Sequence, residues 1–192
     1  IMFLDNFSAR GAINTYEDQS QVPNYAGYVD AFMALEYLSK DPKINIKKVG
    51  ITGWSRGGMN STMISEKRLR NMLISKDLYY AAALPRAVDC YGGGFFENPQ
   101  PIKETKTWMV NGEIDDVTLA KPCIGFVEKL KANGANIELT TKKGWGHGFE
   151  ANYEAEFEPQ AQVFNDCPPY YIRDDGTTNP DAVYSWDDPC IG

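Results

Sequence analysis

The sequence predicts an α/β domain in which a mostly parallel sheet is covered by helices on both faces. Short apolar runs alternate along the chain with amphipathic stretches, and this alternation is typical of strand–helix units around a parallel sheet. The 192 residues, of which 43% are hydrophobic and 23% charged, suffice for one domain with its own core. No apolar run reaches the roughly 18 residues that a membrane-spanning helix needs.

Each apolar run and each amphipathic stretch predicts one element. In chain order these are a buried strand at residues 1–4, a helix at 23–39, a strand at 48–52, a helix at 58–66, a strand that begins at 79–83, a strand at 107–110, a helix at 118–133, a strand at 137–141 and a final helix at 151–164. Residues 1–164 therefore form the expected core. Residues 165–192 are rich in Pro, Asp and Gly and are expected to form an irregular tail.

A sharp strand-to-helix turn is predicted at Gly53-Trp-Ser-Arg-Gly57, which directly follows the strand at 48–52. A serine in such a G-x-S-x-G sequence is lifted clear of the sheet, and the glycines avoid collisions with neighbouring backbone. Ser55 is thus the candidate nucleophile. The next helix points its N-terminus at the same place, so the backbone N–H of Arg56 is the candidate donor to a developing oxyanion.

A serine nucleophile needs a base, and His147 is the only histidine in the chain. It lies in a glycine-rich loop after the last predicted strand. Proteins with this kind of turn carry the serine, the acid and the histidine in that order along the chain. The acid then falls after the strand at 107–110, where Asp115 and Asp116 compete. One of them would orient His147, and the other would cap the following helix.

Four stretches keep the order and spacing of motifs found in a known family. They are Asp5-Asn-Phe-Ser-Ala-Arg-Gly11, Gly53-Trp-Ser-Arg-Gly-Gly58, Gly112-Glu-Ile-Asp-Asp116 with Pro122-Cys123, and Gly146-His-Gly-Phe149. With them the chain resembles the dienelactone hydrolase family, which implies the α/β-hydrolase fold. The resemblance places the acid at the first aspartate and so implies a triad of Ser55, Asp115 and His147. Founding members use a cysteine nucleophile, so the chain is similar to the serine-bearing branch, and dienelactone is not the expected substrate.

Three further side chains are candidates for contact with substrate. Arg10 lies in the loop after the first predicted strand, where family members can hold an arginine that meets a substrate carboxylate. A solvated loop charge or an ion pair is the alternative for Arg10. Trp54 and Trp145 flank triad residues and would either line a substrate pocket or pack in the core.

The resemblance also implies that part of the fold lies outside this sequence. It assigns residues 1–4 to the fourth strand of the sheet, so the first three strands and the early loop that donates a second oxyanion N–H have no counterpart. The absence of the third strand would leave a gap beside the fifth, with unpaired backbone groups. We therefore expect the chain to be a fragment, weak or inactive alone, that is partnered by the missing N-terminal segment of the same protein.

The four cysteines bear on the compartment in which the protein works. Cys90 and Cys123 fall near the ends of predicted elements and are expected to be free or packed. Cys167 and Cys190 lie in the tail, where a disulfide would staple a segment without a core of its own. Such a bond predicts a periplasmic or secreted protein, whereas reduced thiols would fit a cytoplasmic one. No C-x-x-C pair occurs, so a zinc site is not expected.

These features favour an enzyme that cleaves a carboxylic ester or lactone through an acyl-serine intermediate, without a metal or an organic cofactor. A peptidase or an acyltransferase could use the same triad, and a non-catalytic binding domain of hydrolase ancestry is the alternative from another class. The expected partner is a small ester or lactone. The formal net charge of -7 and the dispersed basic residues argue against nucleic acid, and no membrane partner is expected.

Overall fold

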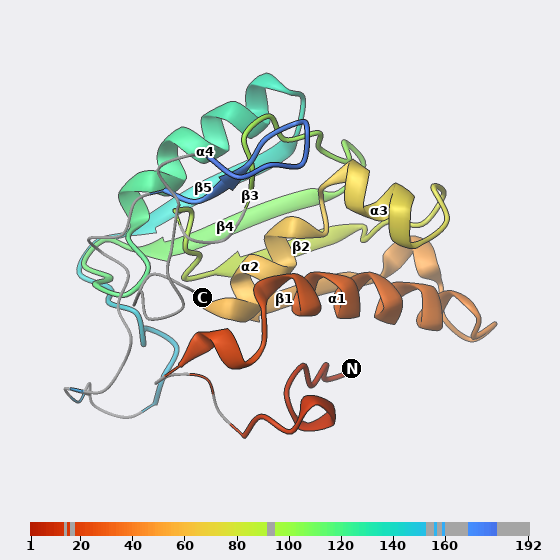
Figure 1. Cartoon of the computed structure of the whole chain (residues 1–192), viewed down its shortest axis with the longest axis horizontal. Helices are drawn as coiled ribbons and strands as arrows, with labels where there is room; N and C mark the ends of the chain where they lie inside the picture. Colours follow the sequence, from red (N-terminus) through yellow and green to blue (C-terminus); the bar gives the residue numbers. More distant parts are fainter. Residues whose placement is uncertain are drawn as a thin grey trace.

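The computed structural model describes residues 1–13, 15, 18–91, 95–152, 156, 159 and 169–179. Its centre is a parallel sheet with the strand order β1-β2-β4-β5 (Figure 1). The strands are β1 Gly50–Trp54, β2 Ala82–Arg86, β4 Lys106–Gly112 and β5 Asn136–Lys142. Because the strands are parallel, their carboxyl ends meet at one edge of the sheet, and the predicted triad residues follow three of these ends.

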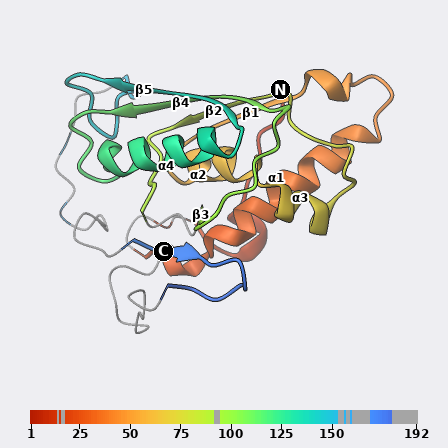
Figure 2. The same cartoon turned by 90° about the horizontal axis from the view of Figure 1, so that it is seen from above.

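In the part of the chain that the structure describes, all α-helices lie on one face of the sheet (Figure 2). The α-helices are α1 Asn24–Ser39, α2 Arg56–Met63, α3 Lys67–Leu73 and α4 Ala120–Ala132. Three short 3-10 helices also occur, η1 Ser8–Arg10, η2 Gln19–Gln21 and η3 Ile46–Lys48. The parallel sheet confirms the predicted α/β class. The prediction of helices on both faces is wrong for the described residues, whose α-helices cover one face only. None of the described helices combines the length and the apolar character that crossing a bilayer would require.

Strand residues alternate between the helix-covered face and the opposite face of the sheet. Met109 and Ile137 face the helices and are 0% and 6% exposed, whereas Trp108, on the opposite face of β4, is 52% exposed. Burying an apolar side chain of this size stabilises a fold by about 1.5–3 kcal/mol, so the helix-covered face holds most of the stabilising contacts. The larger cluster of buried side chains there comprises Tyr28, Met59, Met63, Val88, Phe95, Met109, Cys123, Val127, Leu130 and Ile137.

The N-terminal residues do not form the predicted strand. Residues 1–5 have no regular structure, and Ile1 and Phe3 are 116% and 93% exposed. A strand persists only when a neighbour takes up its backbone hydrogen bonds. Among the described residues, β1 pairs with β2 on one side and has no strand on its other side. The prediction of a buried strand at residues 1–4 is therefore wrong, and β1 is an edge strand.

The expected tail contributes a short strand. β6 Tyr171–Ile172 pairs in parallel with β3 Phe95–Phe96 in a small second sheet. The described tail residues 169–179 therefore contact the core rather than extending from it. The division into residues 1–164 and 165–192 stays a prediction, and most of the final helix expected at 151–164 lies outside the described residues.

Cys90 and Cys123 are joined in a disulfide, with their Cα atoms 5.0 Å apart. The prediction that these two cysteines are free or packed is wrong, because the fold brings the loop after β2 against the first turns of α4. The bond closes a sequence separation of 33 residues. Cys167 and Cys190, the pair expected to be bonded, lie outside the described residues.

Candidate active site

Ser55 lies on the turn between β1 and α2, where the sequence places it. Its backbone has φ 55° and ψ -117°, a combination that non-glycine residues rarely adopt. Two backbone hydrogen bonds hold the turn: the Ser55 N–H donates to the Arg86 carbonyl at 2.9 Å, and the Met59 N–H donates to the Ser55 carbonyl at 3.0 Å. The strained conformation presents the serine hydroxyl at the edge of the sheet, as a nucleophile requires.

Two glycines around Ser55 are required by close backbone approach. A Cβ on Gly53 would lie 2.2 Å from the Gly57 carbonyl oxygen, and a Cβ on Gly58 would lie 2.3 Å from the Arg86 carbonyl oxygen. Gly57 differs, because a Cβ there would meet nothing within 4 Å. The steric reason given by the sequence therefore holds for Gly53 and Gly58, and for Gly57 the structure offers no such reason.

His147 lies beside Ser55, with its Nε2 atom 3.0 Å from the serine Oγ. Trp54 packs on the imidazole with the ring centroids 4.6 Å apart, and its indole Nε1–H donates to the His147 carbonyl at 2.9 Å. Trp54, which the sequence assigns either to substrate contact or to core packing, thus holds the candidate base directly.

Asp115 completes the arrangement from a buried position in the loop after β4. Its Oδ2 and Oδ1 atoms lie 3.0 Å and 3.1 Å from His147 Nδ1, and its side chain is 0% exposed. Burial alone would raise the pKa of this carboxyl, but hydrogen bonds from His147 and Thr118 outweigh it and hold the pKa below its ordinary value. Asp115 is therefore an anion that can orient the imidazole.

The two aspartates do not divide their tasks as the sequence suggests. Asp115 contacts His147 and also accepts the backbone N–H groups of Val117 and Thr118. α4 begins after Leu119 without a side-chain cap, so the expected cap from the second aspartate is wrong. Asp116 is exposed, and the histidine is held by Asp115.

The loops that carry Asp115 and His147 are tied to each other. The Ile114 N–H donates to the Trp145 carbonyl at 3.1 Å, and a Cβ on Gly112 would lie 2.1 Å from that same oxygen. Trp145 itself stacks on Phe149 at 4.8 Å and is 40% exposed. The described contacts of Trp145 therefore hold the histidine loop together.

The two arginines named by the sequence have structural partners. The guanidinium of Arg56 donates to the backbone carbonyls of Val22 and Gln19, while its backbone N–H lies in the first turn of α2, where helices lack internal acceptors. Arg10 makes a bidentate ion pair with Asp30 on α1, in which Nη1 lies 2.7 Å from Oδ2 and Nη2 lies 2.8 Å from Oδ1. The structure thus shows the ion pair that the sequence leaves open for Arg10.

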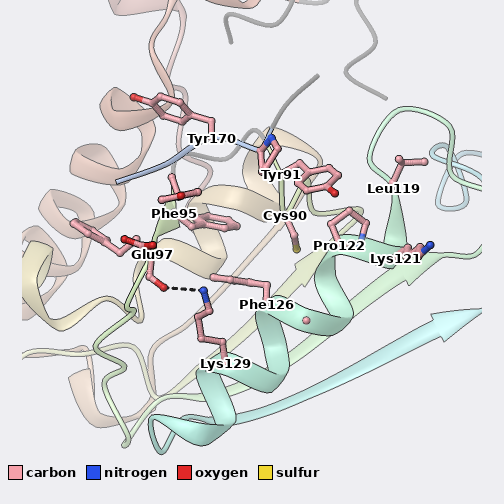
Figure 3. A pocket seen from close by; sticks show the side chains of 14 residues that line it. Cys90, Tyr91, Phe95, Glu97, Leu119, Lys121, Pro122, Phe126, Lys129 and Tyr170 are labelled. Atoms are coloured by element: carbon pink, nitrogen blue, oxygen red, sulfur yellow. Dashed lines mark hydrogen bonds between the residues drawn. The ribbon is translucent and has the colours of Figure 1, made fainter. Parts of the chain in front are cut away.

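A cavity of about 760 Å³ lies along α4 (Figure 3). Aromatic side chains line it, including Tyr91, Phe126 and Tyr170, and Cys90 of the disulfide lies at its wall. One end reaches Leu119, the N-cap of α4. None of the three triad side chains is among its described lining residues, so the cavity adjoins the site without containing it.

The sequence did not reveal every residue that shapes the site. Thr118 contacts Asp115 and His147, and its spacing three residues after an aspartate could have suggested a turn that holds the carboxylate. The contact between Trp54 and His147 joins residues 93 positions apart and leaves no local signal. Within the described ranges, no group of three or more His, Cys, Asp or Glu side chains is placed to hold a metal ion.

The three side chains meet at the carboxyl edge of a parallel sheet, where a serine on a strained turn can pass its proton to a histidine held by a buried aspartate. This arrangement defines a serine hydrolase of the α/β-hydrolase class. The chain belongs to the dienelactone hydrolase family, whose model matches residues 8–164. A comparison with curated protein sequences finds no match.

Solved structures of α/β-hydrolases share the fold. MGS-M1, an α/β-hydrolase from a Medee basin deep-sea metagenome library, is 20% identical, with a TM-score of 0.51 over 66% of this chain and 52% of its own. The thermophilic esterase Est2 of Thermogutta terrifontis is 16% identical, with a TM-score of 0.50 over 67% and 56%. Dipeptidyl peptidase 4 of Porphyromonas gingivalis is also 16% identical, with a TM-score of 0.50 over 65% and 20%. The chain thus spans about half the length of the first two proteins, and at these identities the likeness extends to the fold alone.

Proposed function

We propose that the protein hydrolyses carboxylic esters or lactones through an acyl-serine intermediate, with Ser55, His147 and Asp115 as its catalytic triad. The observation that carries the proposal is the unbroken line of contacts from Ser55 Oγ to His147 Nε2 at 3.0 Å and from His147 Nδ1 to Asp115 Oδ2 at 3.0 Å. A proton can move from the hydroxyl to the imidazole along this line without any rearrangement of the backbone.

The reaction follows from these contacts in two halves. In the first, Ser55 Oγ attacks the carbonyl carbon while His147 Nε2 takes the hydroxyl proton, and the same proton then goes to the departing alkoxide. In the second, His147 takes a proton from water, whose oxygen attacks the acyl carbon, and returns it to Ser55 as the acid leaves. A lactone reacts in the same way, with its alkoxide still attached to the acyl group.

In both halves, negative charge develops on the carbonyl oxygen of the substrate in the transition state. We assign the stabilisation of this charge to the start of α2. The backbone N–H of Arg56 follows Ser55 directly and lies at the positive end of that helix. In enzymes with such donors, the loss of one of them costs about 10²–10³ in kcat. Asp115 acts at the other end of the triad, where its negative charge favours the imidazolium that forms as His147 takes the proton.

A covalent serine probe and a substrate panel test this proposal. The full-length protein would be incubated with a fluorophosphonate, with Ser55→Ala as the control, and assayed against esters of graded acyl length, a lactone and a dipeptide amide. Labelling at Ser55 with turnover of esters or the lactone supports the proposal. Labelling with turnover of the dipeptide amide alone would show a peptidase, and a protein that is neither labelled nor active would be a binding domain.

We also propose that the protein works in an oxidising compartment, the periplasm or the exterior of the cell. The Cys90–Cys123 disulfide supports this, because such bonds persist outside the reducing cytosol. The test is alkylation of protein captured from its native cells before and after reduction. Thiols at Cys90 and Cys123 that are alkylated without prior reduction would overturn it.

A further inference from the structure

Thr118 occupies the junction between Asp115 and His147. It lies one residue before the N-cap of α4 and is 4% exposed. Its Oγ1 atom is 2.8 Å from Asp115 Oδ2 and 3.1 Å from His147 Nδ1. A single hydroxyl therefore contacts both the candidate acid and the candidate base.

The chemistry of the three partners decides which atom donates to which. A threonine hydroxyl has one hydrogen, and an ionised carboxylate is a stronger acceptor than a neutral ring nitrogen. The hydrogen of Thr118 therefore goes to Asp115 Oδ2, and a lone pair of Oγ1 faces His147 Nδ1. All the oxygens around Nδ1 are then acceptors, since Asp115 Oδ1 and Oδ2 lie at 3.1 Å and 3.0 Å.

This arrangement selects one tautomer of the imidazole. Surrounded by acceptors, Nδ1 must carry the proton, so Nε2 presents its lone pair to Ser55 Oγ at 3.0 Å. That is the form in which a histidine can accept the serine proton. If the Thr118 hydroxyl donated to Nδ1 instead, the ring proton would sit on Nε2 and the base would be blocked.

We infer that Thr118 is a positioning residue of the triad: its hydroxyl holds the Asp115 carboxylate and keeps the proton of His147 on Nδ1. The inference rests on the proposed function, because the tautomer matters only if His147 acts as a base. It adds to that function a residue outside the three triad members, which acts through Asp115 and His147 rather than on the substrate.

The position of the Asp115 carboxylate depends on the Thr118 hydroxyl, because the two carboxylate oxygens accept hydrogen bonds from different groups. Oδ1 accepts the backbone N–H groups of Val117 and Thr118, at 3.0 Å and 2.8 Å, and these two donors remain when Val117 or Thr118 is replaced by any residue except proline. Oδ2 accepts the Thr118 hydroxyl and faces His147 Nδ1. Without the hydroxyl, Oδ2 would keep only its contact with His147, in a site where a missing hydrogen bond is costly.

Two variants separate the hydroxyl from the shape of the side chain. Thr118→Val keeps the branched shape and removes the hydroxyl, whereas Thr118→Ser keeps the hydroxyl and removes the methyl group. With p-nitrophenyl acetate as probe, we expect Thr118→Val to lower kcat about tenfold with KM unchanged, and Thr118→Ser to stay close to the wild type. A loss of packing would affect the serine variant at least as much as the valine variant.

A second readout does not depend on turnover. His147 is the only histidine of the chain, so protein labelled with ¹⁵N-histidine gives one imidazole whose protonated nitrogen can be assigned directly. We expect the proton on Nδ1 in the wild type and in Thr118→Ser, protected from exchange with solvent, and faster exchange in Thr118→Val.

The outcomes separate this inference from the proposed function. A ring proton on Nε2 in the wild type, or Thr118→Val with wild-type exchange and wild-type kcat, would overturn the role of Thr118. If the wild type hydrolysed none of the test esters, the proposed function would fail, and the His147 signal would still show whether Thr118 fixes the tautomer.

Discussion

The two sides of the candidate site are held by different kinds of interaction. On the nucleophile side the backbone sets the position of Ser55, through its positive φ and the close approaches at Gly53 and Gly58. On the acid–base side, side-chain hydrogen bonds from Thr118 and Trp54 add to the backbone contacts that hold Asp115 and His147. The nucleophile side should therefore be sensitive mainly to added atoms, and the acid–base side also to the loss of individual side-chain hydrogen bonds.

The largest effect is expected from Asp115→Asn. An asparagine amide can donate to His147 Nδ1, which would shift the ring proton to Nε2 and block the base, so kcat should fall by about 10⁴-fold. The control is Asp116→Asn, which should retain kcat because Asp116 is exposed and His147 is held by Asp115. Steady-state ester hydrolysis by both variants checks this, and a larger loss in Asp116→Asn would reverse the assignment of the acid.

The same substitution should alter the dependence of stability on pH. The pKa of Asp115 is lowered in the folded protein, because hydrogen bonds from His147 and Thr118 outweigh the effect of burial. A group of this kind stabilises the fold fully above its ordinary pKa and loses that contribution as the pH falls through the lowered value. The free energy of unfolding of the wild type should thus fall more steeply with acid than that of Asp115→Asn, as measured by urea titration.

The next largest effect is expected on the nucleophile side, from Gly58→Ala. The new Cβ would lie 2.3 Å from the Arg86 carbonyl, an atom that also accepts the Ser55 N–H. We expect the free energy of unfolding to fall by about 3 kcal/mol. Gly57→Ala is the matched control, since its Cβ has open space on the same helix and should be neutral or stabilising. Equal losses in both variants would contradict this account of the turn.

A smaller effect is expected from Trp54→Phe, which keeps an aromatic ring against His147 and removes the Nε1–H bond to its carbonyl. We expect kcat to fall by up to about tenfold, the effect of one hydrogen bond. Trp108→Phe serves as the control, because it also loses an indole bond, to Thr140, on the opposite face of the sheet. If both variants lost the same activity, Trp54 would have no special part in holding His147.

The smallest effect is expected from Arg10→Ala. Its ion pair with Asp30 is partly exposed, and such pairs contribute little to stability. We expect turnover of a neutral ester to be unchanged and the unfolding midpoint to fall slightly, equally in Arg10→Ala and Asp30→Asn. A rise in KM for an acidic ester in Arg10→Ala alone would instead support the carboxylate contact that the family resemblance implies.

The same contrast explains what could be predicted from the sequence. The turn at Ser55 was predicted from its glycines, and α1, β4 and β5 were predicted near their observed positions from the spacing of their apolar residues. Side-chain contacts between distant residues leave no such mark. Packing between distant segments produces three contacts that no local sequence pattern predicts. They are the Cys90–Cys123 disulfide, the hydrogen bond from Trp54 to the His147 carbonyl, and the ion pair of Arg10 with Asp30.

At residues 1–4, by contrast, the local sequence pattern predicted a strand that the structure does not form. An apolar run of this length is compatible with a buried strand, but burial needs a neighbouring strand to complete the hydrogen bonds. The described residues provide none beside Ile1–Leu4, and the segment is exposed.

The central claim is that His147 activates Ser55. Its most direct test is the rate at which a fluorophosphonate adds to Ser55 in the wild type and in His147→Gln, followed by intact mass with the modified peptide sequenced. The account predicts one adduct, on Ser55, formed about 10²–10⁴ times more slowly in His147→Gln. Equal rates in the two proteins, or an adduct on any other residue, would contradict it.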